Sequence, residues 1–252
     1  MKNTVLALLT ALALPSAATA MAPDCVVLLH GLARSETSLL AMQAALNAQG
    51  FHVVNQGYPS TRQPIATLME ENVIPAVASC GAAKVNFVTH SMGGILARLY
   101  LSRYQPENLG RVVMLAPPNH GSELVDTFGG SRLFQWYHGP AGNQLGTDAA
   151  ALPNQLPRPD YPLGIIAGNA SISAGSAWVE GPDDGKVSVE STKLDGMTAH
   201  VTLPVTHTFM MLNPRTIAQT VLFLRQGRFE PNLPVIEAIE IATGREKPIA
   251  QP

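Results

Sequence analysis

Short apolar runs alternate with segments of helical spacing along most of the chain, and this alternation limits the possible folds more than any other feature. Buried strands are indicated at 26–29, 51–54, 85–89, 111–116, 163–167 and 200–205. Helices are indicated at 37–49, 65–77, 92–104 and 216–226, with Pro75 expected to kink or divide the second. Because strands joined by helices pair in parallel, the pattern predicts an α/β fold with a mostly parallel sheet covered by helices on both faces.

Composition excludes several classes of protein. With 46% hydrophobic and 13% charged residues among 252, the chain is too apolar to be disordered. The 16 Lys and Arg against 18 Asp and Glu leave no positive excess, so we expect no nucleic-acid partner. Two cysteines are too few for a zinc ribbon. Since no cluster of metal ligands is evident, we expect no metal and no cofactor.

The N-terminal segment 1–20 has the pattern of a secretory signal peptide. One lysine precedes the ten-residue apolar run Val5 to Leu14, Pro15 ends the run, and Ala18-Thr19-Ala20 is typical of a cleavage site. The run is about half of the ~20 residues that a bilayer span needs, and we expect no transmembrane segment elsewhere. The sequence therefore predicts an exported mature protein, 21–252, located in the periplasm or outside the cell.

Two regions interrupt the strand–helix pattern. Between about 117 and 162 glycine, proline and asparagine are frequent, and aromatic residues gather at 128–137 without a clear period. We expect a cap or lid insertion there, over the carboxyl edge of the sheet. The proline-containing tail, 227–252, is expected to be extended or partly disordered. We expect residues 21–252, both regions included, to form a single domain.

The two cysteines stand just before two of the expected strands. Cys25 precedes the run 26–29, and Cys80 precedes the run 85–89. If these runs are neighbouring parallel strands, both cysteines lie at the same edge of the sheet. Export would place them in an oxidising compartment, so the sequence predicts a disulfide between Cys25 and Cys80.

The segment Asn86 to Gly94 places Ser91 at the turn between a strand and a helix. Gly93 follows two positions later, as in the nucleophile elbow, where a strained turn exposes a serine hydroxyl above the sheet. The segment resembles the Gly-x-Ser-x-Gly motif of the α/β-hydrolase superfamily, especially of secreted bacterial lipases and esterases. Thr89 replaces the first glycine of that motif.

This resemblance implies partners for Ser91, in the chain order serine, acid, histidine. Segment 181–188 resembles the Asp-Gly-x-Val segment of bacterial lipases, which implies Asp184 as the acid, with Asp183 as the near alternative. Only His200 and His207 follow. His207 lies directly after a strand, in the loop where the base is expected, whereas His200 opens the same strand at its opposite end.

The resemblance also implies the donors of an oxyanion hole. Leu28 to Leu32 is similar to the His-Gly-x segment of the family, in which the residue after glycine donates its backbone N–H. That residue is Leu32, and Met92, which follows Ser91, supplies the second N–H. Gly31 is expected to permit the unusual backbone that aims the first donor inward.

Taken together, the motifs imply a secreted serine hydrolase that cleaves carboxylic esters through an acyl-enzyme intermediate. Its partner would be a small-molecule or lipid ester, with lipid-interface contact through the cap. Two other readings stay open: a thioesterase, amidase or acyltransferase on the same triad, and a non-catalytic binding protein with this fold. Some secreted lipases hold structural Ca²⁺, but we match no ligands for it in this sequence.

Overall fold

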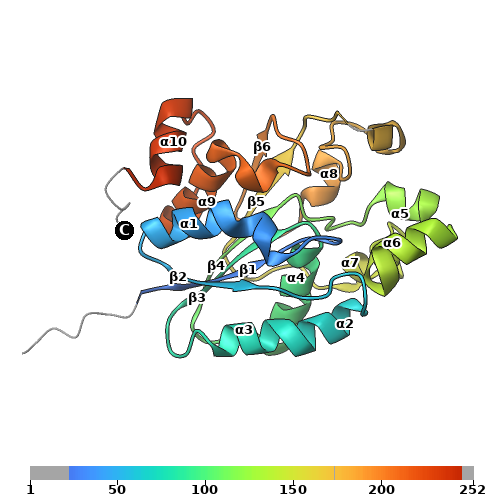
Figure 1. Cartoon of the computed structure of the whole chain (residues 1–252), viewed down its shortest axis with the longest axis horizontal. Coiled ribbons are helices and arrows are strands. Elements are labelled where there is room, and N and C mark those ends of the chain that lie inside the picture. The colour runs from blue at the N-terminus through green and yellow to red at the C-terminus, as the bar shows by residue number, and fades with distance from the viewer. Residues whose placement is uncertain (1–22, 173, 246–252) are drawn as a thin grey trace, which may run out of the picture.

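The computed structural model describes residues 23–172 and 174–245, so the expected signal peptide, 1–20, lies outside the described residues. Its centre is a sheet of six parallel strands in the order β2-β1-β3-β4-β5-β6 (Figure 1). The strands are β1 (Cys25–Leu29), β2 (His52–Gln56), β3 (Val85–His90), β4 (Leu109–Leu115), β5 (Leu163–Gly168) and β6 (Ala199–Leu203). Every residue of β1, β3 and β5 is buried. The predicted α/β fold with a parallel sheet is confirmed.

Helices cover both faces of this sheet. On one face lie α2 (Ile65–Leu68), η2 (Met69–Val73), α3 (Ile74–Ala78) and α4 (Met92–Tyr104). On the other lie α1 (Leu40–Ala48), α9 (Pro214–Gln226) and α10 (Val235–Thr243), with η1 (Glu36–Leu39) and η4 (Met210–Leu212) beside them. Strand residues alternate between the two cores, as Val27 and Leu29 pack into the first and Val26 and Leu28 into the second.

Pro75 divides the segment 65–77, as predicted. The residues before it form the π-helical turn η2, and Pro75 occupies the first turn of α3. Proline has no N–H to bond to the preceding turn, so the wider turn accommodates a break in the helical hydrogen-bond ladder.

The prediction of an extended tail is wrong for residues 235–243, which form α10. Ala238 and Ile241 are buried on the core that α1 and α9 share, and Gly244, at φ +67°, ends the helix. The prolines of the tail obscured this short apolar repeat, but Pro234 stands just outside the helix, where proline is tolerated. Residues 246–252 lie outside the described residues.

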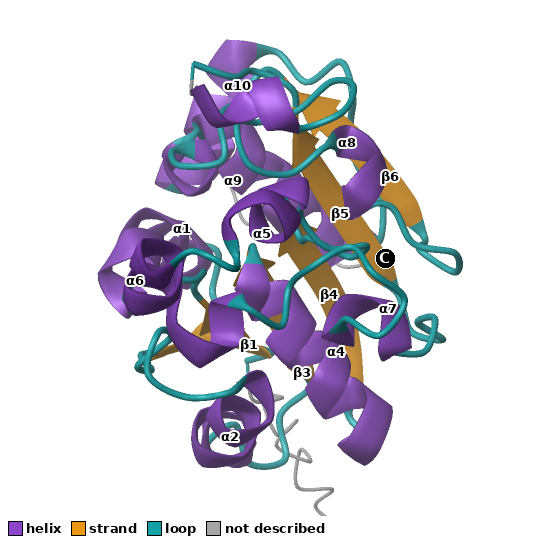
Figure 2. Ribbon diagram, turned by 90° about the vertical axis from the view of Figure 1, so that its right-hand side faces the viewer, coloured by secondary structure: helices purple, strands orange, loops and turns teal. Residues whose placement is uncertain are grey.

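The segment between β4 and β5 carries the short helices α5 (Glu123–Phe128), α6 (Arg132–Gly142) and α7 (Leu152–Gln155). Figure 2 looks onto this side of the molecule, and the three helices lie in front of the strands. The remaining elements, η3 (Ala174–Trp178) and α8 (Val189–Thr192), follow β5. Gly139, at φ +64°, interrupts α6 where a Cβ would meet the carbonyl oxygen of Thr61. These irregular backbones explain why the sequence shows no clear period here.

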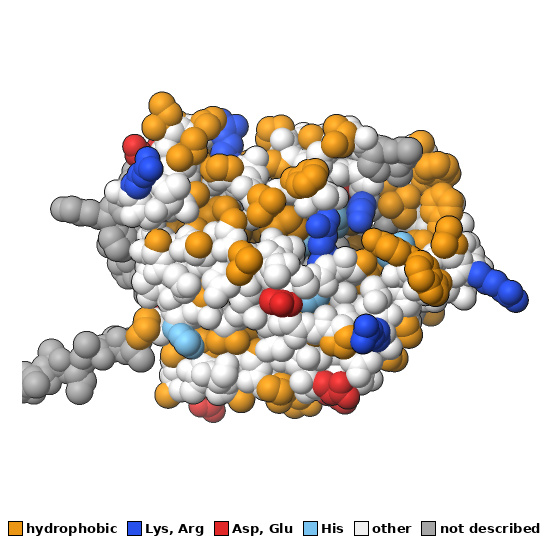
Figure 3. Space-filling view, viewed as in Figure 1, with side chains coloured by type: hydrophobic (Ala, Val, Ile, Leu, Met, Phe, Trp, Pro, Cys, Tyr) orange, Lys and Arg blue, Asp and Glu red, His pale blue; other side chains and the backbone are white. Residues whose placement is uncertain are grey.

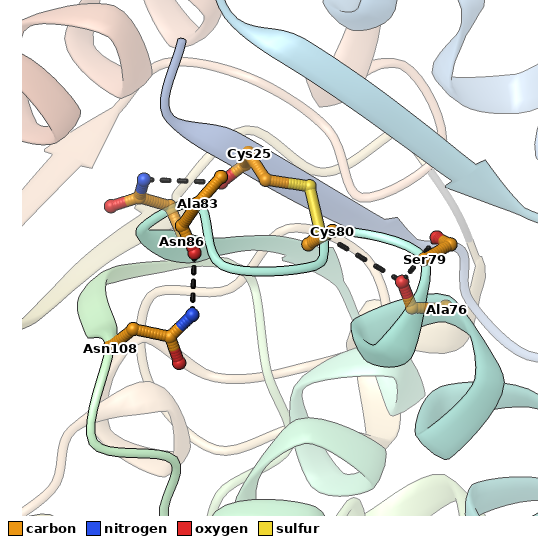
Figure 4. Close-up of a disulfide and its surroundings, with 7 residues drawn as sticks. All are labelled: Cys25, Ala76, Ser79, Cys80, Ala83, Asn86 and Asn108. Atoms are coloured by element: carbon orange, nitrogen blue, oxygen red, sulfur yellow. Dashed lines mark hydrogen bonds between the residues drawn. A yellow bond between two sulfur atoms is a disulfide. The ribbon is translucent and has the colours of Figure 1, made fainter. Parts of the chain in front are cut away.

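Cys25 and Cys80 are joined by the disulfide that the sequence predicts (Figure 4). Cys25 begins β1, Cys80 lies in the turn before β3, and the two strands are parallel neighbours. Side-chain amides support the same corner: Asn86 donates to the carbonyl oxygen of Cys25. The disulfide bond ties the N-terminal edge of the sheet to the end of α3.

Within the described residues, no helix is long and apolar enough to cross a bilayer.

Candidate active site

Ser91 occupies the sharp turn between β3 and α4. Its backbone lies at φ 54° and ψ −124°, a region that residues other than glycine rarely adopt. Two backbone hydrogen bonds hold this strained turn. The N–H of Ser91 donates to the carbonyl oxygen of Leu115 (2.8 Å), and the N–H of Gly94 donates to the carbonyl oxygen of Ser91 (2.9 Å). The turn therefore presents the Ser91 hydroxyl at the carboxyl edge of the sheet.

Small residues are required around this turn because the backbone of β1 passes very close. A Cβ on Gly93 would lie 2.4 Å from the carbonyl oxygen of Leu29. Thr89, which stands where the family motif commonly has glycine, is fully buried, and its hydroxyl has no hydrogen-bond partner. The turn thus accepts threonine at position 89 and requires glycine at position 93, two residues after the serine.

His207 brings its imidazole to Ser91 from the loop after β6. Its Nε2 lies 3.0 Å from the Ser91 Oγ, and its Nδ1 lies 2.8 Å from Oδ2 of Asp184. A carboxylate can only accept, so Nδ1 carries the hydrogen and Nε2 is left to accept from the hydroxyl. The structure brings together the three side chains that the sequence proposed, Ser91, Asp184 and His207.

Asp184 is held in one orientation by the loop around it. Its Oδ1 accepts from the N–H groups of Lys186 (3.0 Å) and Val187 (2.9 Å), which leaves Oδ2 for the imidazole. The backbone carbonyl of Asp184 also accepts from the N–H of His207 (2.9 Å). With 2% of its surface exposed, the carboxylate is shielded from water, which strengthens its bond to the ring.

The alternatives that the sequence left open point elsewhere. The carboxylate of Asp183 accepts from the N–H of Gly185 and from the hydroxyl of Ser176, so it anchors the loop 176–185. His200 has Thr192 as its ring partner, at 3.0 Å. Neither side chain contacts the Ser91 turn through a hydrogen bond.

The two expected backbone donors flank Ser91. Met92 begins α4, and Leu32 lines the same cavity as Ser91. The expectation for Gly31 is wrong, since its φ is not positive; the positive φ of this loop belongs to Ala33, at 54°. Gly31 is needed for space, because a Cβ there would lie 2.9 Å from the His90 ring and 3.1 Å from Ser91.

His90 is a buried neighbour of the site that sequence reasoning did not single out. Its Nε2 donates to the backbone carbonyl of His207 (3.0 Å), and the two rings are 4.8 Å apart. Burial, then the nearby His207, lower the pKa of His90 well below its usual range. The neutral ring of His90 therefore supports the loop that carries His207. In the sequence, its position directly before Ser91 was the signal that could have identified this role.

His30 forms a second buried support, at the end of β1. Its ring stacks on Tyr58 with centroids 3.8 Å apart, and Tyr58 donates its hydroxyl to the His30 carbonyl. The N–H of Tyr58 also donates to the ring Nε2 of His30 (3.3 Å). Burial lowers the pKa of His30 and raises that of Tyr58. This pair fixes the strand end from which the Leu32 loop departs.

A cavity of about 600 Å³ opens beside Ser91 and His207. The insertion supplies most of its apolar wall, and its lining includes Leu124, Val125, Phe128, Phe134, Tyr137 and Trp178. A larger cavity of about 1210 Å³ elsewhere on the surface contains none of Ser91, Asp184 and His207. The smaller cavity is therefore the one that serves the site. No group of three metal-binding side chains occurs among the residues that the structure describes.

A parallel sheet covered on both faces, with a serine at the turn after a central strand, defines the α/β hydrolase class of folds. The sequence agrees with this class: residues 24–159 match the family model described as the alpha/beta hydrolase fold. The chain belongs to the α/β hydrolase family.

Similarity to individual proteins is more limited. A triacylglycerol lipase from Pseudomonas fragi is 46% identical over 46 residues, which cover 18% of this chain and 15% of that lipase. The mature form of the Bacillus licheniformis lipase BlEst2 is 20% identical with a TM-score of 0.60, covering 78% of this chain and 90% of that one. The type II thioesterase BorB, of the borrelidin biosynthetic cluster, is 19% identical with a TM-score of 0.53, covering 84% and 94%. At these identities the structural matches show the shared fold alone.

Proposed function

We propose that this protein is a serine hydrolase that cleaves carboxylic esters, of the lipase or esterase type. The observation that carries the proposal is the continuous chain of hydrogen bonds from the hydroxyl of Ser91 through the His207 ring to the Asp184 carboxylate. A serine hydroxyl is a weak nucleophile until a base takes its proton, and this chain supplies the base and its orienting acid.

The reaction follows from these roles. Nε2 of His207 takes the proton of Ser91 while Oγ attacks the ester carbonyl carbon. The bond from that carbon to the alcohol oxygen then breaks, and the imidazolium returns the proton to the departing alcohol. Water, deprotonated by the same ring, attacks the acyl-enzyme, releases the acid and restores the Ser91 hydroxyl. Asp184 orients the ring and stabilises its positive form throughout.

The backbone N–H groups of Leu32 and Met92 are the proposed donors to the oxyanion that forms at the carbonyl oxygen. Met92 begins α4, whose positive dipole end faces the reacting centre. Both donors belong to the main chain. Substitution of their side chains should therefore cost less activity than loss of Ser91.

The cavity beside Ser91 supports esters with an apolar acyl or alcohol part, from a small molecule or a lipid. The insertion also exposes large apolar side chains, with Leu133, Trp136 and Tyr137 exposed by 72%, 78% and 56%. We propose that segment 117–162 is a cap that contacts a lipid interface. The Cys25–Cys80 disulfide and the N-terminal pattern support export of a mature protein, 21–252, to the periplasm or outside the cell.

A thioesterase, amidase or acyltransferase would use the same three side chains, and BorB shows that a thioesterase shares this fold. The runner-up function is therefore another acyl transfer at Ser91. A binding protein without catalysis would have no need of a strained serine aligned with a base.

The test is labelling with a fluorophosphonate, followed by intact mass and peptide mapping. The wild type should gain one adduct at Ser91, and the variant S91A should gain none. Ser122→Ala is the matched control, because Ser122 lines the same cavity but its hydroxyl donates to the Lys186 carbonyl. Absence of an adduct on folded wild type would overturn the proposal.

A chain-length series of nitrophenyl esters, with matched thioesters and an emulsified triglyceride, then separates the candidate reactions. Faster cleavage of esters than of thioesters supports the main proposal. A rise in rate once the substrate exceeds its solubility would support a lipase with interfacial contact, and no rise would favour an esterase.

A further inference from the structure

Two cationic side chains line the cavity beside Ser91, although the rest of its lining is largely apolar. Arg34 follows the Leu32 loop, and Lys186 follows Asp184 by two residues. Among the described residues, no Asp or Glu lines this cavity, and neither cation forms an ion pair. The cavity therefore holds two positive side chains next to the nucleophile, and no ion pair compensates them.

The two cations line one cavity and influence each other and the reacting groups. Loss of solvent, then the charge of Arg34, lower the pKa of Lys186, while Asp184 raises it. Besides burial, both cations help to lower the pKa of His90, and Lys186 helps to lower the pKa of His138 on the cap side of the cavity. The positive region thus extends from His90, below the Ser91 turn, to His138 in the cap. Figure 3 shows blue Lys and Arg side chains beside pale-blue histidines at a hollow, with orange hydrophobic side chains toward α5 and α6.

Asp184 offsets only part of this positive charge. Its carboxylate favours the charged form of Lys186, but its oxygens bond to His207 and to two backbone N–H groups, and it forms no ion pair with either cation. Two like charges near each other repel, and an incoming anion would relieve this repulsion.

We propose that Arg34 and Lys186 form a binding site for an anionic group, a carboxylate or a phosphate, carried by the ester that Ser91 attacks. The proposal rests on the proposed ester hydrolysis and narrows its substrate class. The apolar wall takes the hydrocarbon part of such an ester, and the cations take its charged part. The planar guanidinium of Arg34 matches the paired oxygens of either anion, and Lys186 adds a point charge.

A general role in catalysis makes a different prediction. If the cations merely stabilised the oxyanion of every substrate, removing them would slow neutral and anionic esters by the same factor. The informative quantity is therefore the ratio of kcat/KM for an anionic ester to kcat/KM for its neutral counterpart.

The test uses 3-butanoyloxy-4-nitrobenzoate and its methyl ester, in which the remote carboxyl group is charged in the first and neutral in the second. Release of the nitrophenol reports cleavage of the butanoyl ester alone. The ratio is measured for the wild type, R34Q, K186Q and the double variant. Arg228→Gln and Lys84→Gln serve as matched controls, because both side chains are exposed and neither lines the cavity. We expect each cavity substitution to lower the ratio about threefold, and the double variant to lower it about tenfold. The controls should not change it.

Salt gives an independent check. The wild-type ratio should fall as ionic strength rises from 0.01 M to 0.5 M, because the screening length shortens from about 30 Å to a few ångströms. The double variant should lose most of this dependence. An equal slowing of both esters in the double variant, with the ratio unchanged, would overturn the proposal.

A binding measurement keeps the proposal separate from the proposed function. Calorimetry with the non-hydrolysable ether analogue, 3-butoxy-4-nitrobenzoate, should show about tenfold weaker binding to the double variant than to the wild type, whether or not the esters are cleaved. Equal binding would refute the anion site. Dihexanoyl phosphatidate against dihexanoyl glycerol repeats the comparison with a phosphate: a larger loss of ratio with this pair assigns a phosphate source, and a larger loss with the benzoate pair assigns a carboxylate.

Discussion

Replacing Asp184 by asparagine tests the proposed triad where the structure is most specific. The Oδ1 of Asp184 accepts two backbone N–H groups, so an asparagine must keep its carbonyl oxygen on that side. Its NH₂ group then faces Nδ1 of His207, which must become an acceptor. The ring hydrogen moves to Nε2, the atom that lies 3.0 Å from the Ser91 hydroxyl.

The consequence is loss of the base rather than loss of the fold. With Nε2 protonated, His207 cannot take the Ser91 proton. The equivalent change in a serine protease triad lowers kcat about 10,000-fold, which corresponds to about 5 kcal/mol of barrier. We expect a loss of this order for D184N. The variant should remain folded, because the new side chain has the same shape and keeps both backbone bonds.

The matched control is Asp183→Asn. Asp183 contacts Gly185 and Ser176 but makes no hydrogen bond to His207, so the variant should lose about 1–3 kcal/mol of stability and keep kcat within about tenfold. The assay is kcat for 4-nitrophenyl butyrate, with thermal unfolding to verify the fold. A D184N enzyme that keeps a tenth of its activity, or an Asp183→Asn enzyme that loses a thousandfold while folded, would refute the reasoning.

Three further predictions test the scaffold. Gly93→Ala should abolish fluorophosphonate labelling and lower Tm by several degrees, since its Cβ would lie 2.4 Å from the Leu29 carbonyl; a labelled variant of normal Tm would contradict this. Replacing Cys25 and Cys80 by serine removes the cross-link between residues 55 positions apart and should lower the free energy of unfolding by about 4 kcal/mol. Urea unfolding measures this loss, and an unchanged midpoint would contradict it. The folded state lowers the pKa of His90 below the usual 6.5, so the unfolded chain takes up this proton first as pH falls. The free energy of unfolding should therefore fall below about pH 6.5, by up to 1.4 kcal/mol per pH unit. The urea midpoint of H90N should fall less steeply with pH than that of the wild type, and an equal fall would assign the effect to other groups.

Local patterns predicted most of the scaffold correctly because its elements are regular. The apolar runs became β1 to β6, and the helix expected at 92–104 is α4 over the same residues. The turn at Ser91 was also visible, because its geometry depends on a strand, a helix and a glycine that are neighbours in the chain. Helix α10 was missed, since its burial depends on α1 and α9, which lie far from it in sequence.

The resemblance favoured Asp184 over Asp183, but residue chemistry and position in the chain did not separate the two adjacent carboxylates. Asp183 and Asp184 have the same chemistry and nearly the same position in the chain, and only the folded loop decides which one faces His207. The role of Gly31 was misread for a similar reason, because the need for space comes from the His90 ring across the turn.

The order of residues alone thus determined the α/β architecture, the serine at the strand–helix turn and the pairing of the two cysteines, because each follows from periodicity or from neighbouring parallel strands. Tertiary structure alone decided which aspartate meets the imidazole, how His90 supports it and that two unpaired cations share the cavity. These features depend on side-chain directions and distances between remote segments, and such distances exist only once the chain has folded.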